Sequence, residues 1–270
     1  MSHQRQKMMR ALRDSGLMTL ADTVRYPFSV LKYYRKERLF NARNPGFKVP
    51  PRFLAFDAYS APDWDFYKLS GSETATFLSA TAKRYLPENA KLRVLEWGCG
   101  PARVIRHIPS NFGSEAEVYG SDYNTDTIGW CIRNIPGVTF SLNGLRPPLP
   151  FEEKFFDFVY SISVFTHLSE PVGLEWVNEL YRIMRSGAIA VISTNGDSLL
   201  DKLLPEELET YKSRGVVVRG KVQEGKKMFF TLHSPAYVRE SLFKSFEIVE
   251  FASGGFPYIP HQDLWILRRL

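Results

Sequence analysis

One stretch of the sequence decides the fold: Val94-Leu-Glu-Trp-Gly-Cys-Gly-Pro-Ala-Arg-Val104. An apolar run ends at Gly98 and a turn of small residues follows, which is typical of a strand that ends at a ligand-binding turn. Glycine in such a turn lets the backbone approach a ligand closely, with amides directed into the crevice. Because ligands of open α/β sheets bind beyond the carboxyl ends of the strands, this turn is a candidate binding site.

The segments around this turn alternate between strand and helix patterns. Ser70 and Glu73 are spaced as a capping box, which predicts a helix through about Arg84. Asn124 or Thr125 can cap the next helix, and apolar residues at 3–4 spacing predict another over 174–184. Strands are predicted at 92–97, 117–122, 138–142, 155–163 and 187–194, followed by a hairpin (215–219 with 226–233), a helix (235–244) and strands near 246–251 and 263–268. This alternation predicts an α/β fold with a Rossmann-like, doubly wound, mostly parallel sheet.

The first 66 residues differ from the rest of the chain. Residues 1–50 hold 11 Lys/Arg and 3 Asp/Glu, a net +8, whereas the other 220 residues carry 24 basic and 26 acidic side chains, a net −2. Prolines, aromatic residues and cations are interleaved here, so we expect a basic helical N-terminal extension over 1–66 and a main domain over 67–270.

Three roles for this extension remain open. Leu17, Leu20, Ala21, Val24, Phe28, Leu31 and Tyr34 fall near helical spacing, with Pro27 as an interruption. Such a helix can pack on the main domain as a lid over the acceptor pocket. Residues 1–50 can instead make peripheral contact with an anionic membrane. A nucleic-acid arm is the third and least favoured reading.

Composition excludes several classes of protein. Two cysteines, Cys99 and Cys131, are too few for a disulfide scaffold or a multi-cysteine zinc site, and no metal is expected. No stretch reaches the roughly 20 apolar residues of a membrane span, and Met1–Arg10 lacks the apolar core of a secretory signal. A reduced, cytoplasmic setting is therefore predicted.

The residues of the turn discriminate between nucleotide-binding patterns. A dinucleotide fingerprint fails because its third glycine would fall at Arg103, and no Gly-Lys-Ser/Thr follows for a phosphate loop. What remains is Glu96-x-Gly98-x-Gly100, where the acid suits a ligand with a cationic end and would repel a pyrophosphate. Asp122, 22 residues after Gly100, ends the second predicted strand and can accept both hydroxyls of a ribose. Tyr123 beside it offers a flat face to an adenine ring.

These residues resemble the class I S-adenosylmethionine-dependent methyltransferases. The similar segments are Glu96-Trp-Gly-Cys-Gly-Pro-Ala-Arg103, Tyr119-Gly-Ser-Asp-Tyr123, Leu145-Arg-Pro-Pro-Leu-Pro-Phe151 with Phe155-Phe-Asp-Phe-Val-Tyr-Ser161, and Val164-Phe-Thr-His-Leu168. Bacterial members that act on small molecules often end in a segment like Gln262-Asp263-Leu264. Three positions depart from the family pattern: Ala102 replaces its third glycine, Ser186-Gly187-Ala188 replaces its Pro-Gly-Gly turn, and Asn143 replaces an acid after the third strand.

The resemblance implies a seven-stranded sheet, S-adenosylmethionine as cofactor, and a set of cofactor-binding residues. Those residues are Gly71, Glu96, Gly98, Cys99, Gly100, Arg103, Asp122, Tyr123, Asn143, Gly144 and Ser161. Glu96 and the turn would hold the methionine end, with help from free amides at Gly71 if a helix starts there. Asp122 would bind the ribose, Tyr123 and Asn143 the adenine, and Ser161 would face the reacting methyl.

The acceptor side carries a weaker signal. His167 is the candidate general base, and Tyr67, His233 and His261 are candidate substrate contacts. No Asp/Asn-Pro-Pro-Tyr follows the fourth strand, where the chain reads Ser161-Ile-Ser-Val164, so amino-methylation of bases or glutamine is disfavoured.

The predicted function is methyl transfer to oxygen or nitrogen of a small-molecule, sugar or lipid-linked acceptor. The main alternative is a non-catalytic module that binds the cofactor for regulation or as a scaffold, with a basic arm for membrane or nucleic acid. Another nucleoside-binding Rossmann-like enzyme, such as a reductase, is a third possibility. The oligomeric state stays open.

Overall fold

The computed structural model describes residues 10–87, 91–113 and 115–270, which form two compact units. One unit comprises residues 20–142, and the other comprises residues 143–270 together with the segment that ends at Thr19. The predicted division at 66/67 falls inside helix α4 (Trp64–Tyr85) and stays a prediction. No helix in the described part of the chain is long and apolar enough to cross a membrane.

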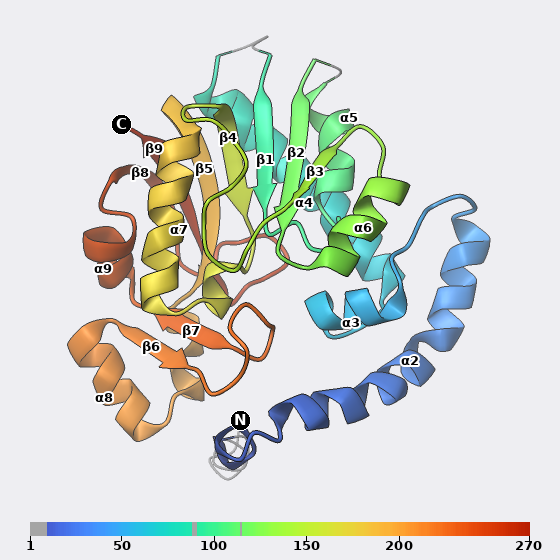
Figure 1. The fold of residues 1–270 in the computed structure, drawn as a ribbon, viewed down its shortest axis with the longest axis horizontal. Helices are drawn as coiled ribbons and strands as arrows, with labels where there is room; N and C mark the ends of the chain where they lie inside the picture. The colour runs from blue at the N-terminus through green and yellow to red at the C-terminus, as the bar shows by residue number, and fades with distance from the viewer. Residues whose placement is uncertain (1–9, 88–90, 114) are drawn as a thin grey trace. The chain divides into compact units, whose positions relative to one another are not determined.

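Three parallel strands make the centre of the 20–142 unit. They are β1 (Arg93–Trp97), β2 (Glu117–Asp122) and β3 (Thr139–Leu142), in the order β3-β2-β1. Around them lie η1 (Ile105–His107), α5 (Ile108–Phe112) and α6 (Thr125–Asn134). Helix α4 packs on η1 and α5, whereas α6 packs along β2 and β3 (Figure 1). The predicted cap of α6 is confirmed, because the Asn124 side chain accepts a hydrogen bond from the Thr127 amide.

The predicted start of the helix before β1 is wrong. Helix α4 begins at Trp64, and the Asp63 side chain caps it by accepting from the Phe66 amide at 3.2 Å. Ser70 is buried in the helix interior, where its hydroxyl donates to the Phe66 carbonyl. The Ser70/Glu73 spacing resembles a capping box but lies within a helix that an earlier cap has already started.

The N-terminal segment contains a long helix, α2 (Met18–Arg43), and a short one, α3 (Arg52–Tyr59). Helix α2 continues through Pro27, where an interruption was predicted. Phe40, near its end, is buried with Ala55, Trp64 and Tyr67, which belong to α3 and α4. The apolar series predicted to pack as a lid, including Leu20 and Phe28, is exposed instead. The helix therefore packs through a different face from the one that the sequence pattern indicates.

The 143–270 unit contains the other four strands of the main sheet. They are β4 (Phe156–Ser161), β5 (Met184–Asn195), β8 (Phe246–Ala252) and β9 (Gln262–Arg269). Strand β5 is parallel to β4 and antiparallel to β9, which in turn pairs antiparallel with β8. The seven strands follow the order β3-β2-β1-β4-β5-β9-β8, so the predicted Rossmann-like, mostly parallel α/β sheet is confirmed.

The same unit carries the predicted hairpin as a separate two-stranded sheet. Strands β6 (Val216–Arg219) and β7 (Phe230–His233) are antiparallel, and their core includes Tyr211 of α8 (Pro205–Arg214). The remaining helices are η2 (Phe165–His167), α7 (Glu170–Ile183), η3 (Asp197–Lys202), α9 (Pro235–Tyr237) and η4 (Val238–Leu242).

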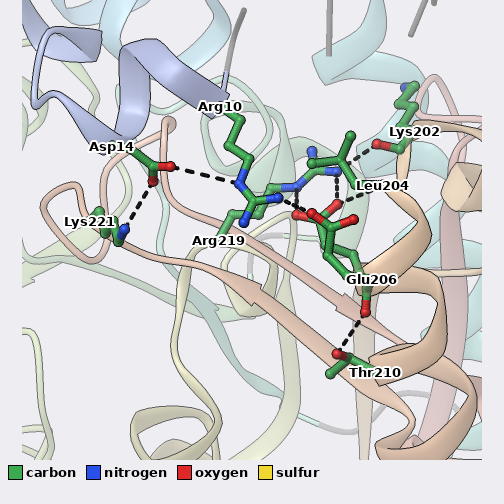
Figure 2. A network of polar contacts seen from close by, with 9 residues as sticks. Arg10, Asp14, Lys202, Leu204, Glu206, Thr210, Arg219 and Lys221 are labelled. Carbon is green, nitrogen blue, oxygen red and sulfur yellow. Dashed lines mark hydrogen bonds and ion pairs between the residues drawn. The ribbon is translucent and has the colours of Figure 1, made fainter. Parts of the chain in front are cut away.

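Residues 10–14 are joined to this hairpin by a polar network (Figure 2). Arg10 pairs with Glu206, and Lys221 lies 3.0 Å from Asp14. These pairs are exposed, so each contributes at most about 1 kcal/mol to stability. The basic character of the chain's start is thus partly neutralised by acids of the 143–270 unit and of the segment itself.

Gly71 permits the close approach of α4 to the turn after β1. A Cβ at Gly71 would lie 1.9 Å from the Arg103 carbonyl oxygen, a backbone atom that cannot swing away. We expect Gly71→Ala to lower the free energy of unfolding by about 3 kcal/mol through overpacking. Urea denaturation measures this change.

Gly129 in α6 is the matched control for that substitution. Its Cβ would meet only the Arg133 side chain, at an ordinary 3.5 Å. Gly129→Ala should raise stability by about 0.5–1 kcal/mol, since alanine is the better helix former. Equal stability changes in the two variants would contradict the packing role assigned to Gly71.

Candidate functional site

The turn after β1 is held in a left-handed conformation at three alternate positions. The φ angles are 76° at Gly98, 50° at Gly100 and 59° at Ala102. Glycine adopts this region freely, whereas Ala102 does so at a cost in strain. The amides of Gly98 and Cys99 both donate to the Ser121 carbonyl, at 2.8 and 2.9 Å. The turn is therefore fastened to the end of β2.

Asp122 fastens the turn a second time. One carboxylate oxygen accepts the Gly100 amide at 2.9 Å, and the other accepts the Asn124 amide at 2.8 Å. A carboxylate accepts several hydrogen bonds, which is the property that the ribose prediction requires. The ribose contact of Asp122 stays a prediction. Tyr123, the predicted adenine contact, follows directly and is half-buried.

Glu96 and Tyr59 define the other end of the turn. Glu96 is buried near the end of β1. Burial is the main cause of the raised pKa of Tyr59 and of Cys99, and the charge of Glu96 adds to both. The Tyr59 hydroxyl lies 3.5 Å from where a Cβ on Gly100 would be. Burial raises its pKa well above 10 while Arg103 opposes the rise, so the hydroxyl stays neutral and can donate a hydrogen bond. Sequence reasoning missed Tyr59, because only the packing of α3 brings it to this turn.

Three predicted site residues make contacts within the protein that support the turn. The hydroxyl of Tyr67, almost fully buried, donates to the Pro101 carbonyl at 2.6 Å and accepts from Arg106, so it offers an acceptor no surface. Arg103 is buried, and its guanidinium donates to the Ser70 hydroxyl at 3.1 Å. Gly71 lies inside α4, so it has no free amide for a carboxylate. The assignments of Tyr67 and Gly71 are therefore corrected to support of the turn, whereas the cofactor contact of Arg103 stays a prediction.

Cys99 is a neutral thiol in the turn. Burial, chiefly, raises its pKa well above the usual range, and its contact with Cys131 adds to the rise. The sulfur is therefore not a thiolate at neutral pH, which excludes it as a nucleophile. Its backbone amide is committed to Ser121.

Several buried polar atoms of the 143–270 unit have no hydrogen-bond partner within the described residues, and two of them belong to predicted cofactor contacts. Those two are the hydroxyl of Ser161, which ends β4, and the amide oxygen of Asn143. The Asn143 nitrogen donates to the Gly144 carbonyl at 2.7 Å, which directs its oxygen away from that carbonyl. Unsatisfied buried polar atoms are costly, so these two are groups that a ligand would satisfy.

His167 is oriented by the backbone. Its Nδ1 lies 2.8 Å from the Phe229 carbonyl oxygen, which can only accept, so Nδ1 carries the proton. Nε2 is then the basic nitrogen. Burial lowers the pKa of His167 below 6.5, against an opposing effect of the Phe229 hydrogen bond. The ring is thus a neutral imidazole with one committed and one available nitrogen, which is what a general base needs.

The other two candidate histidines differ from His167. His233 is buried and stacks on Tyr237 with ring centroids 5.8 Å apart, and burial lowers its pKa to about 4. Its Nδ1 has no hydrogen-bond partner within the described residues, and its contact with a substrate stays a prediction. His261 is exposed in the turn before β9, and its carbonyl accepts from Ser198. Its contact with a substrate stays a prediction.

The residues present fit S-adenosylmethionine. Within the 20–142 unit, the buried acid Glu96 and the neutral hydroxyl of Tyr59 suit a cationic tail, and Asp122 suits a ribose diol. Within the described residues, no group of His, Cys, Asp or Glu has the arrangement of a metal site.

Comparison with known proteins gives a match to one family model and a likeness of fold. Residues 94–187 match a family model described as a methyltransferase domain. A solved S-adenosylmethionine-dependent methyltransferase of Methanosarcina mazei is 18% identical, with a TM-score of 0.54, over 70% of this chain and 97% of that one. At such identity the likeness is one of fold.

Two enzymes with stated acceptors share this fold. The 1,6-didemethyltoxoflavin-N1-methyltransferase of Burkholderia thailandensis is 12% identical, with a TM-score of 0.55, over 80% of this chain and 85% of that one. The glycopeptide N-methyltransferase MtfA is 14% identical, with a TM-score of 0.52, over 76% and 96% of the two chains.

The geometry at His167 gives a prediction that can be tested without knowing the methyl acceptor. We expect its imidazole to titrate below pH 6.5 and to be protonated on Nδ1 when neutral, because burial disfavours the charged ring and the Phe229 carbonyl selects the tautomer. The basic form should therefore persist as the pH falls through 6.5. Nitrogen-15 NMR of labelled histidine, assigned with His167→Gln, measures both properties. A pKa above 6.5, or a neutral ring protonated on Nε2, would contradict the assigned geometry.

Proposed function

We propose that this chain is a class I S-adenosylmethionine-dependent methyltransferase and that it methylates oxygen or nitrogen of a small-molecule, sugar or lipid-linked acceptor. The observation that carries the proposal is the Asp122 carboxylate, which accepts the Gly100 amide at 2.9 Å and so places an acid at the end of β2 directly beside the glycine turn. This one side chain joins the glycine turn to the sugar site. A turn without it would be a generic anion-binding loop.

The proposed reaction needs no covalent intermediate with the protein. S-adenosylmethionine, when bound, supplies a methyl group that its sulfonium has already activated. The chain's own task is to bind and orient the reactants, because aligned reactants lower the barrier by several kcal/mol. Glu96, Tyr59 and the turn amides would hold the charged tail, and Asp122 and Tyr123 would hold the nucleoside.

The remaining assignments concern the adenine and the acceptor. Asn143 and Gly144 would meet the adenine edge, and Ser161 would face the reacting centre. His167 would take the proton from an acceptor hydroxyl or ammonium through Nε2, while the Phe229 carbonyl holds Nδ1. His261 is proposed as a substrate contact.

A small acceptor is supported by two features. The two enzymes named above act on a small heterocycle and on a glycopeptide, both on nitrogen. The Ser161-Ile-Ser-Val164 segment lacks the prolines and tyrosine of enzymes that methylate amino groups of bases or glutamine. An acceptor smaller than a nucleic acid or protein therefore fits best.

We propose that the protein is cytoplasmic and that residues 1–66 are an extension of a domain at 67–270. Residues 1–50 are proposed to make peripheral contact with an anionic membrane. Nucleic acid is disfavoured as a partner. The oligomeric state is open.

The first experiment is mass spectrometry of the small molecules that the purified protein retains. We expect S-adenosylmethionine or S-adenosylhomocysteine, since the site fits both. A retained nicotinamide nucleotide would overturn the proposal in favour of a reductase. Tight donor binding without any methylated product across acceptor libraries would favour the non-catalytic module.

A second test uses Asp122, whose carboxylate is proposed to bind the ribose. Asp122→Asn removes the charge and one of the two acceptor oxygens, so we expect S-adenosylmethionine affinity to fall about 10–100-fold, as for loss of a hydrogen bond to a charged group. Isothermal titration calorimetry measures this affinity. Asp126→Asn, in the first turn of α6, removes an exposed acid four residues away and should bind normally. Unchanged affinity in Asp122→Asn would refute the ribose assignment.

A further inference from the structure

We propose that the exposed side of α2 binds a lipid surface that carries negative charge. The proposal concerns one defined face, here called the outward stripe: Leu20, Val24, Phe28, Leu31 and Leu39. It rests on the membrane contact proposed above for residues 1–50 and deepens it, because it assigns that contact to one face of a helix that supplies no residue to the proposed donor site.

The outward stripe is a continuous apolar row on the helix surface. Its first four members are spaced by four, four and three residues, so they lie within one narrow sector at about 100° per residue. Their exposed fractions are large: Leu20 60%, Val24 53%, Phe28 69%, Leu31 75% and Leu39 58%. At about 1.5 Å per residue the row extends roughly 29 Å. So many exposed large apolar side chains in one row indicate a binding surface.

The opposite side of α2 is already occupied by its own unit. Tyr26 packs on Phe56 with ring centroids 5.3 Å apart, and Glu37 accepts from Arg52 at 2.8 Å. Phe40 is buried in the cluster with Ala55, Trp64 and Tyr67. The helix therefore packs on its own unit through this inner side, and the outward stripe takes no part in that packing.

The charges of α2 are sorted between the two sides. Its two acids, Asp22 and Glu37, lie toward the inner side, where Glu37 pairs with Arg52. Arg35 and Arg38 fall on the outward sector and have no ion pair in the described part of the chain. Lys32 flanks the same row and is exposed. The outward side is thus apolar and cationic, without an acid.

This combination selects an anionic lipid surface over the other occupants. A second copy of the chain would bring Arg35 and Arg38 against the same cations, which repel. A nucleic acid would pair with the cations but leave Leu20, Val24 and Leu31 in contact with charged phosphates. Lipid satisfies both properties, since apolar side chains enter the acyl region while arginine side chains reach the anionic headgroups.

Vesicle co-sedimentation of the full chain tests the proposal. We expect binding to phosphatidylcholine vesicles that contain phosphatidylglycerol, weaker binding to phosphatidylcholine alone, and a decrease at high salt. Phe28→Gln/Leu31→Gln should weaken binding about tenfold or more, because two large apolar side chains no longer enter the membrane. Arg35→Gln/Arg38→Gln should weaken it about thirtyfold, and only for the anionic vesicles.

Matched control variants replace two apolar residues or two cations that are exposed elsewhere in the same unit. Leu69→Gln/Ile132→Gln replaces two exposed apolar residues of α4 and α6, and Lys83→Gln/Arg133→Gln removes two exposed cations. Both should bind vesicles like the unchanged protein. Glutamine is a good helix former, so circular dichroism and S-adenosylmethionine affinity should be unchanged in all four variants. The donor site is thereby tested separately from the lipid face.

Three results would overturn the proposal. The unchanged protein could ignore anionic vesicles, or the control variants could lose as much binding as the stripe variants. Alternatively, light scattering could show a dimer that Phe28→Gln/Leu31→Gln converts to a monomer while vesicles remain unbound, in which case the stripe is an interface between copies of the chain.

Discussion

The Asp122 carboxylate is the constraint on which the proposed donor site depends. It accepts the Gly100 amide with one oxygen and the Asn124 amide with the other, so one side chain holds the glycine turn, the end of β2 and the start of α6 together. Because the Gly98 and Cys99 amides are tied to Ser121 as well, the turn cannot drift from β2. A ribose that binds Asp122 therefore meets a site already in place, and little binding energy is lost in ordering it.

Helices α3 and α4 support the turn that follows β1. Tyr67 of α4 donates to the Pro101 carbonyl, Arg106 donates to Tyr67 and covers Phe47, and Tyr59 of α3 reaches Gly100. The close approach that makes these contacts possible depends on Gly71, where any side chain would strike the Arg103 backbone. These N-terminal helices therefore have two separate roles. Helix α3 places Tyr59 against the turn, and the outward stripe of α2 is the face proposed to bind a lipid surface.

Errors of prediction at particular residues have a common origin. Ser70 and Glu73 have capping-box spacing, yet Asp63 starts the helix earlier, because a local pattern cannot reveal that the chain upstream is already helical. His167 and His233 look alike in sequence, yet one is aligned by the Phe229 carbonyl and the other is packed on Tyr237. Tyr59 gave no signal, since its proximity to Gly100 links residues 41 positions apart through the packing of α3. The apolar row of α2 predicted a buried face and is exposed.

The order of strands and helices, the glycine turn and the two acids at strand ends were determined by the sequence alone. The physical reason is that they depend on local periodicity, on backbone conformations open to glycine, and on the rule that parallel strands present their carboxyl ends at one edge. Tertiary structure alone decided which polar atoms are satisfied, which histidine is oriented, and which side of α2 is covered. Those properties depend on burial and on contacts between segments far apart in the chain, which no local pattern encodes.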